Sequence, residues 1–171
     1  MGKLRFLIAL IVGKVSILLL DKIFKRGTNL PGEIMLKICP DALSRFTMPK
    51  TTVCVTGTNG KTGTSNLLTH IIRNSGKTVV NNSKGSNMAP GLVTALASDC
   101  NLGGKVKSDV AVLEVDERSS QFIYTKFVPD YILCTNLFRD SIMRNGHSGF
   151  IFDKINDYLD EKTTLVLNGN D

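Results

Sequence analysis

The sequence has few cysteines and no pair of them at a metal-binding spacing. Cys39, Cys54, Cys100 and Cys134 lie far apart in the 171 residues, without a Cys-x-x-Cys pair. This spacing indicates neither a disulfide framework nor a zinc site. Free thiols are typical of a reducing compartment, so we expect the protein to be cytoplasmic.

A hydrophobic run long enough to cross a bilayer is also lacking. Residues 6–20 are apolar except for Lys14 and Ser16, and they fall short of the ~20 residues that a spanning helix needs. Lys3 and Arg5 precede the run as in a signal peptide, but no small-x-small cleavage site closes it. We therefore expect a helix that lies in a membrane interface or docks on the protein's own domain, and the sequence leaves both alternatives open.

An excess of basic residues is absent from most of the chain. Residues 1–50 contain nine Lys/Arg and three Asp/Glu, which gives the whole net charge of +6, whereas residues 51–171 contain twelve of each. A nucleic-acid-binding protein is expected to carry its basic patch on the folded domain, so we expect no nucleic-acid partner. A basic, apolar helical arm over 1–50 instead favours a peripheral contact with the inner face of an anionic membrane.

Residues 56–62, Thr-Gly-Thr-Asn-Gly-Lys-Thr, carry the strongest functional signal. They follow a β-branched run at 51–55 and precede a helix-spaced apolar segment at 67–72, which is the context that a phosphate loop requires. Gly57 and Gly60 allow the tight turn that points several backbone N–H groups at a phosphate. The alternative, an ordinary turn with a chance Gly-Lys-Thr, is disfavoured by the flanking strand and helix.

The loop residues expected to bind ATP lie between that strand and that helix: Gly57, Thr58, Asn59, Gly60, Lys61 and Thr62. The helix adds its positive N-terminal end, Lys61 a mobile cation, and Thr62 a hydroxyl ligand for Mg²⁺. The loop is shorter than the usual form, since Val55 stands where that form has its first glycine. We therefore predict that the chain binds a nucleoside triphosphate.

From residue 51 onward, short apolar runs alternate with helical segments. Strands are expected at 51–56, 78–80, 109–115, 131–135 and 163–167, and helices at 61–75, 89–97 and 149–159. This alternation predicts an α/β fold over 51–171, with a mainly parallel sheet covered by helices on both faces. Before it, helices are expected at 6–20 and from Pro31 to about residue 38. Ligands of such sheets bind beyond the carboxyl ends of the strands.

Polar residues follow three of these expected strands. Glu114 ends the third and is the expected Mg²⁺ ligand, directly or through water, whereas Glu117 and Arg118 fit a solvated charge run. The turn at 135–140 after the fourth strand fits either a site or a capped loop with Asp140 as N-cap. The amide-rich loop at 84–91 after the second strand is a further candidate to face a substrate.

Together these residues resemble the Mur ligase family of ATP-dependent amide-forming enzymes. The resemblance rests on the loop at 56–62, the strand ending at Glu114 and the Thr135-Asn136 turn. Within the family, the ligase subunits that amidate lipid II are most similar. They share with this chain the segments at 26–32 (Arg-Gly-Thr-Asn-Leu-Pro-Gly), 37–40 (Lys-Ile-Cys-Pro), 85–88, 113–117, 135–140 and 164–168.

The resemblance implies the central ATP-binding domain of a Mur ligase and a set of residue roles. Lys61 and Glu114 would be catalytic, and Asn136 would contact ATP. Substrate-side positions would be Asn87, Arg139 and Asp140. It also implies that ATP and Mg²⁺ serve to phosphorylate the D-glutamate α-carboxylate of lipid II. Ammonia from a GatD-type glutaminase partner would then give D-isoglutamine.

Three other functions remain open from the sequence. They are another Mur-family ligase such as a folylpolyglutamate synthase, a non-catalytic ATP-binding module, and a membrane-associated P-loop NTPase switch.

Two features depart from the family pattern. Residues 141–147 read Ser-Ile-Met-Arg-Asn-Gly-His where the subfamily usually has Gln-Leu-Asp-Arg-Tyr-Gly-Glu, so Met143 replaces an acid. The chain also ends at Asp171, whereas family members continue through the rest of the ATPase domain and a carboxyl-terminal domain. The family's four-cysteine zinc ribbon and supporting aspartate are not in the sequence. We therefore expect a fragment or a truncated product.

Overall fold

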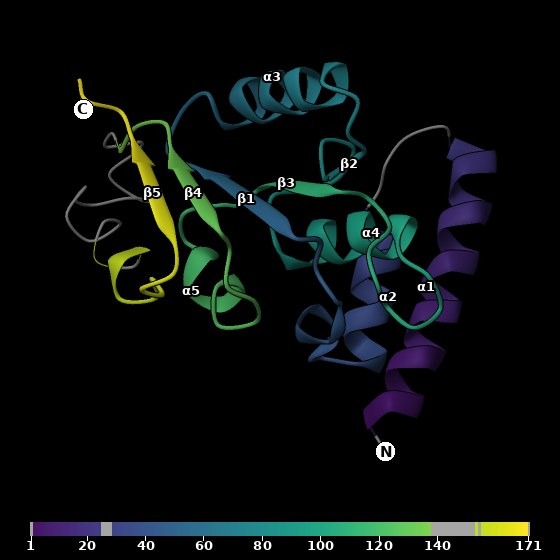
Figure 1. The fold of residues 1–171 in the computed structure, drawn as a ribbon. Coiled ribbons are helices and arrows are strands. Elements are labelled where there is room, and N and C mark those ends of the chain that lie inside the picture. The colour runs from purple at the N-terminus through teal and green to yellow at the C-terminus, as the bar shows by residue number, and fades with distance from the viewer. Residues whose placement is uncertain (1, 25–28, 138–152, 154, 171) are drawn as a thin grey trace.

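The structure, a computed structural model, describes residues 2–24, 29–137, 153 and 155–170 (Figure 1). Its centre is a five-stranded sheet in the order β2-β3-β1-β4-β5, and every pair of neighbouring strands is parallel. The strands are β1 (Thr51–Thr56), β2 (Val79–Asn81), β3 (Val110–Glu114), β4 (Tyr131–Cys134) and β5 (Thr164–Leu167). The predicted parallel α/β architecture is confirmed.

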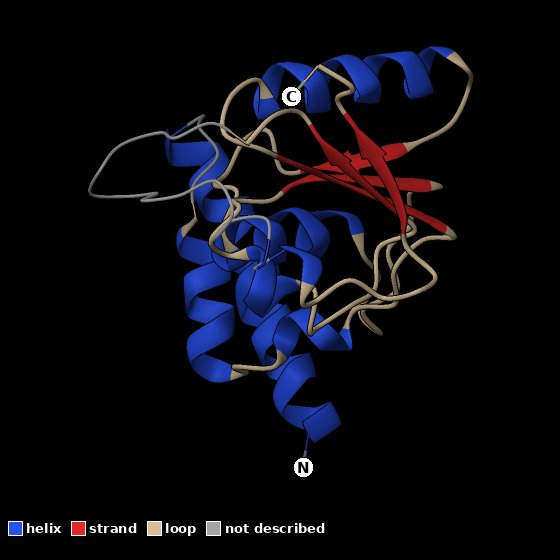
Figure 2. Cartoon of the chain, turned by 90° about the vertical axis from the view of Figure 1, so that its left-hand side faces the viewer, coloured by secondary structure: helices blue, strands red, loops and turns tan. Residues whose placement is uncertain are grey.

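Helices cover both faces of the sheet (Figure 2). One face carries α3 (Lys61–Asn74), whereas α4 (Ala89–Asp99) and α5 (Ser120–Ile123) lie on the other. Side chains alternate along β1, so Val53 and Val55 pack toward Leu68 of α3, whereas Cys54 belongs to the larger cluster on the opposite face. The central strands are thus buried on both sides, as their continuous apolar sequences predict.

The amino-terminal helices pack on the α4 side of this sheet. They are α1 (Gly2–Phe24) and α2 (Leu30–Ile38), followed by the short 3-10 helix η1 (Ala42–Arg45). Phe6 and Leu10 of α1 are buried, and Phe6 meets Phe46 edge-to-face with ring centroids 5.3 Å apart. Lys14 donates hydrogen bonds from Nζ to the carbonyls of Ala97 at 2.6 Å and Cys100 at 2.7 Å.

The packing of α1 is relevant to the two alternatives stated above, a helix in a membrane interface or a helix docked on the protein's own domain. One face of α1 docks on the protein's own domain, and the helix is longer at both ends than the expected span of 6–20. The opposite face remains exposed and apolar. None of the described helices is both long enough and apolar enough to cross a membrane.

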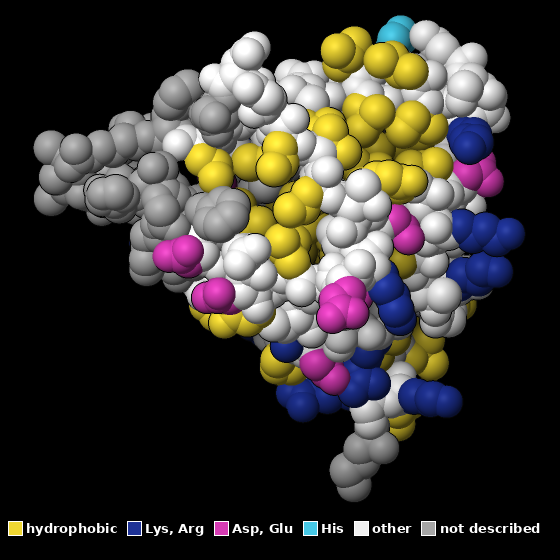
Figure 3. All heavy atoms as spheres, turned by 60° about the vertical axis from the view of Figure 1, so that its left-hand side comes forward, with side chains coloured by type: hydrophobic (Ala, Val, Ile, Leu, Met, Phe, Trp, Pro, Cys, Tyr) yellow, Lys and Arg dark blue, Asp and Glu magenta, His cyan; other side chains and the backbone are white. Residues whose placement is uncertain are grey.

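Two details differ from the expected pattern. The helix α5 was not predicted, because four residues are too few for a helical period to show. β5 is exposed along its whole length, with Leu167 61% exposed, although its apolar sequence predicts burial. Figure 3 shows hydrophobic side chains gathered on the upper part of the face toward the viewer, and the exposed apolar side chains of α3 include Leu67, which is 61% exposed. Of the helix expected at 149–159, residues 149–152 and 154 lie outside the described residues, and residues 153, 155 and 156 are helical.

Candidate functional site

The loop between β1 and α3 turns tightly against the end of β4. Gly57 has a φ of 124°, a conformation that residues with a side chain rarely adopt. A Cβ at this position would lie 2.3 Å from Oγ1 of Thr135 and 2.8 Å from the carbonyl oxygen of Asn136. Only glycine therefore allows the loop to approach the β4 turn this closely.

Asn136 binds this loop through both its side chain and its backbone. Its Oδ1 accepts the N–H of Asn59 at 3.0 Å, its Nδ2 donates to the Asn59 carbonyl at 3.1 Å, and its own carbonyl accepts the N–H of Thr58 at 2.8 Å. Thr135 Oγ1 also donates to the Asn59 carbonyl at 2.7 Å. In this structure Asn136 therefore shapes the loop rather than lying free beside it.

The backbone amides that could bind an anion consequently lie at the start of α3. Gly60, with a φ of 82°, is the N-cap residue, and the backbone ladder of the helix begins with Thr64 N–H donating to the Gly60 carbonyl at 2.9 Å. The N–H groups of Lys61, Thr62 and Gly63 precede this ladder and carry the positive end of the helix dipole. These amides, rather than those of Thr58 and Asn59, form the open part of the cradle.

Lys61 folds back over the loop instead of extending into solvent. Its Nζ donates to the carbonyls of Gly57 and Thr58, the latter at 3.2 Å, and it lies 3.3 Å from Oε1 of Glu117. The side chains of Lys61 and Glu117 are only 13% and 6% exposed. Burial raises the pKa of Glu117, and the charge of Lys61 opposes that shift. The lysine is thus held by three oxygen acceptors.

A second polar chain crosses from α3 to the end of β3. Thr62 Oγ1 donates to Oε2 of Glu114 at 2.8 Å, and Asn87 Nδ2 donates to Oε1 of the same carboxylate at 3.3 Å. Asn82 fixes the backbone beneath it, because its side chain accepts the Glu114 N–H at 2.8 Å and donates to the Glu114 carbonyl at 2.9 Å. Asn82 therefore continues the β2–β3 ladder by one step.

The hydroxyl of Thr62 and the carboxylate of Glu114 are hard oxygen ligands side by side, which fits Mg²⁺. Among the residues that the structure describes, no three His, Cys, Asp or Glu side chains gather as a metal cluster. An ion here would therefore take its other ligands from water and phosphate, as Mg²⁺ commonly does.

The structure brings most of the predicted site residues to one edge of the sheet. The residues found there are Gly57, Thr58, Asn59, Gly60, Lys61, Thr62, Asn87, Glu114 and Asn136. The substrate-side candidates Arg139 and Asp140, and the divergent turn at 141–147, lie outside the described residues. Glu117 was wrongly expected to be solvated, and Asn82 was not expected to contribute at all. The signal for Asn82 was its place directly after β2.

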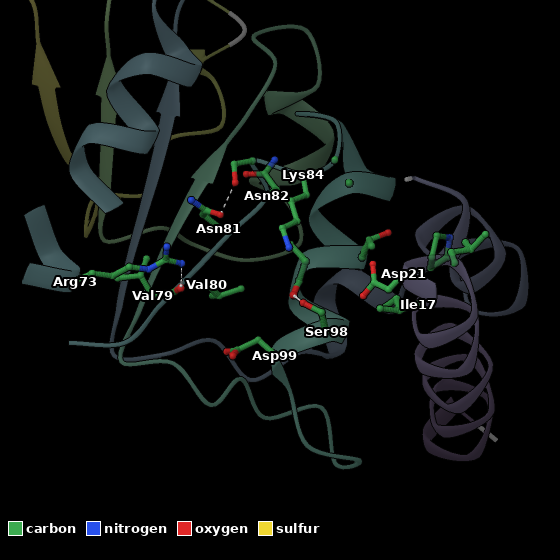
Figure 4. Close-up of a pocket in the computed structure, with 17 residues that line it drawn as sticks. Ile17, Asp21, Arg73, Val79, Val80, Asn81, Asn82, Lys84, Ser98 and Asp99 are labelled. Carbon is green, nitrogen blue, oxygen red and sulfur yellow. Dashed lines mark hydrogen bonds between the residues drawn. The ribbon is translucent and has the colours of Figure 1, made fainter. Parts of the chain in front are cut away.

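A separate cavity of about 390 Å³ lies beside the outer edge of β2 (Figure 4). Its walls come from the carboxyl-terminal part of α1, from α4 and from the loop after β2, and its charged lining residues are Asp21, Arg73, Lys84 and Asp99. Asn82 lines this cavity and also bonds to the backbone of Glu114. The cavity depends on the docking of α1, which the sequence left open.

Comparison with known proteins agrees with this fold. Residues 55–171 match the sequence profile of the Mur ligase middle domain. The "lipid II isoglutaminyl synthase (glutamine-hydrolyzing) subunit MurT" of Staphylococcus aureus strain N315 is 34% identical over 149 residues, which are 86% of this chain and 33% of that protein. The MurT subunit of Streptococcus pneumoniae strain ATCC BAA-255 / R6 is 32% identical over 169 residues, 98% of this chain and 37% of that protein.

The chain thus spans about a third of the length of these curated relatives. Among solved structures, the MurF ligase of Thermotoga maritima in complex with ADP superimposes with a TM-score of 0.61, over 82% of this chain and 33% of that one. At 22% sequence identity this likeness shows the shared fold alone. Since the profile match covers more than half of the sequence, the chain belongs to the Mur ligase family.

Proposed function

We propose that this chain is the ATP-binding part of a Mur-family ligase that amidates the D-glutamate α-carboxylate of lipid II to D-isoglutamine. One observation supports the nucleotide site most directly. Lys61, the amides at the start of α3, and the Thr62–Glu114 pair all converge at the carboxyl end of β1 and β3. The substrate assignment rests on the similarity to MurT subunits over 86–98% of the chain.

The proposed reaction first activates the carboxylate, which does not react with ammonia by itself. A carboxylate is a poor electrophile, because its negative charge repels nucleophiles and it has no good leaving group. Transfer of the γ-phosphoryl group of ATP to the carboxylate oxygen gives an acyl phosphate and ADP. Ammonia then attacks the acyl carbon, phosphate leaves with the C–O bonding electrons, and the nitrogen loses a proton to solvent to give the neutral amide.

The residues of this chain act on the first step. Lys61 Nζ and the amides of Lys61, Thr62 and Gly63 neutralise charge on the transferred phosphoryl group, which is the main requirement of such a transition state. The Thr62 hydroxyl and the Glu114 carboxylate would hold Mg²⁺, which supplies further positive charge there when bound. Asn87 would orient Glu114 through its 3.3 Å hydrogen bond.

The ammonia in this proposal comes from a GatD-type glutaminase partner. The names of the MurT relatives, which describe a glutamine-hydrolysing synthase with subunits, favour this source. Ammonia dissolved in the surrounding solution would attack the acyl phosphate efficiently only at high total concentration, because ammonium, which is not nucleophilic, predominates at neutral pH.

We also propose a cytoplasmic location at the inner membrane face, because lipid II is a membrane-bound substrate. Exposed apolar side chains form a stripe along α1: Leu4 (65% exposed), Ile8 (48%), Ile11 (44%), Val15 (49%), Leu18 (64%) and Leu19 (55%). Residues 1–50 also carry the net charge of +6, which complements an anionic lipid surface. The stripe would lie in the membrane interface while the other face of α1 stays docked.

The test uses the full-length ligase with its glutaminase partner, lipid II, glutamine and Mg-ATP. Lys61→Ala should abolish formation of D-isoglutamine, measured by mass spectrometry of the released stem peptide. The matched control is Lys77→Ala, which removes an exposed lysine after α3 and should leave turnover unchanged. Turnover by Lys61→Ala at the normal rate would contradict the mechanism. Glutamylation of a folate without lipid II amidation would instead favour a folylpolyglutamate synthase.

A further inference from the structure

The Glu117 carboxylate is in an unusual place for an acidic side chain. It lies beneath a loop that is built to bind an anion, yet only 4% of the residue is exposed. Its Oε1 is 3.3 Å from Lys61 Nζ, and Ser120 Oγ donates to its backbone carbonyl at 2.7 Å as α5 begins. The turn into α5 therefore directs this carboxylate inward rather than into solvent.

Lys61 has three donor positions, and in this structure three oxygens engage it. Two are carbonyls of the loop itself, Gly57 and Thr58, and the third is Glu117. The lysine of a loaded phosphate loop reaches the β- and γ-phosphates. A nucleotide must therefore share or take over a position on Nζ that Glu117 holds. The carboxylate is also a negative charge close to the incoming phosphates.

We propose that Glu117 is a positioning residue that occupies, on Lys61 Nζ, the place of a nucleotide phosphate. Without nucleotide it holds Lys61 against the loop, and it thereby weakens nucleotide binding. This inference rests on the proposed nucleotide site and adds a regulator of its affinity. Removing the negative charge of Glu117 should raise nucleotide affinity for two reasons. The phosphates would lose a repulsive neighbour, and the buried Lys61 would lack a counter-ion until the nucleotide supplied one.

The charges around Glu117 fit this role. Asp116 adds negative potential from the same turn, and Tyr124 of the segment after α5 is close enough for Glu117 to raise the pKa of its buried hydroxyl. Burial is the main cause of the raised pKa of both groups. Lys61 is the cation that faces the carboxylate, so its departure toward a phosphate would leave Glu117 without its charge partner.

The test compares Mg-ADP affinity by calorimetry with thermal stability of the nucleotide-free chain. Glu117→Gln should bind Mg-ADP about tenfold more tightly, ~1.4 kcal/mol, yet melt at a lower temperature than the parent chain without nucleotide. Asp116→Asn, the matched control, removes the same charge one residue away. It leaves the Lys61 contact in place and removes only the weaker negative potential of Asp116, so the affinity should rise by less than about twofold.

A purely structural role for Glu117 would lower stability and affinity together, so unchanged or weaker binding by Glu117→Gln overturns the proposal. Should that variant not fold, Glu117→Asp withdraws the carboxylate by one methylene and should tighten binding by about threefold, ~0.7 kcal/mol. Equal or weaker binding by Glu117→Asp would overturn the proposal as well. Absence of binding by the parent chain would refute the nucleotide site itself and this inference with it.

Discussion

Replacing Gly57 by alanine tests how closely the phosphate loop packs on the β4 turn. Alanine must adopt a φ of 124°, which is strained for any residue with a Cβ, at a cost of about 1–3 kcal/mol. The added methyl would also lie 2.3 Å from Thr135 Oγ1 and 2.8–2.9 Å from backbone atoms of Asn136. Relieving such overpacking costs a further 1–3 kcal/mol or so.

We therefore expect Gly57→Ala to lower the free energy of unfolding by about 2–6 kcal/mol. Domains of this size are stable by roughly 5–15 kcal/mol, so the loss should be large in urea denaturation followed by circular dichroism. Mg-ADP affinity should fall too, because the loop has to move away from Asn136.

Two neighbouring glycines serve as graded controls for the same assay. Gly60 has a φ of 82° but nothing within 4 Å of a Cβ, so Gly60→Ala should cost only the backbone term of about 1–2 kcal/mol. Gly63 lies inside α3 with open space around it, and Gly63→Ala should stabilise the chain by ~0.5–1 kcal/mol. Equal stabilities for the Gly57 and Gly63 variants would refute the reasoning.

Three further predictions concern the metal ligands, acid stability and the membrane. Thr62→Val keeps the side-chain shape but removes the hydroxyl, so Mg²⁺-dependent binding of ATP should weaken about tenfold or more by calorimetry, whereas equal affinity would exclude Thr62 as a ligand. Asp109 accepts hydrogen bonds from the Thr78 N–H at 2.8 Å and hydroxyl at 2.7 Å, which hold its pKa below the usual value. Its stabilisation is therefore present above about pH 4 and is lost progressively as the pH falls below that value. Asp109→Asn should thus destabilise the chain at neutral pH, by an amount that shrinks as the pH is lowered, and a difference that stays constant with pH would contradict this. Ile11→Ser combined with Leu18→Ser should reduce flotation of the chain with anionic vesicles, whereas Leu67→Ser on α3, where Leu67 is 61% exposed, should not. Equal losses would argue against the α1 stripe.

The sequence predicted the central strands and the phosphate loop because their signals are local. The β-branched run of β1, the two glycines and Lys61-Thr62 lie within twelve residues, and both their order and their spacing are diagnostic. The meeting of Thr62 with Glu114 also followed from topology, since parallel strands place their carboxyl ends at one edge.

Several features that the sequence did not predict depend on the direction in which a side chain points just after a strand ends, where no periodic pattern applies. Glu114, Asp116 and Glu117 lie in one acidic stretch, and only the turn into α5 decides which of them is buried beside Lys61. Asn82 likewise extends a strand ladder with its side chain, which no periodicity marks. The sequence did not predict which face of α1 docks on the domain, because apolar residues surround most of this helix and more than one face is apolar enough to be buried.

The most direct test of the central claim is an amide NMR spectrum of the ¹⁵N-labelled chain, titrated with Mg²⁺ and a non-hydrolysable ATP analogue. Nucleotide binding at this loop should give saturable shifts concentrated at residues 57–63, with smaller changes at Glu114, Glu117 and Asn136. Unchanged amides at millimolar ligand, or shifts confined to the cavity beside β2, would contradict nucleotide binding at the phosphate loop.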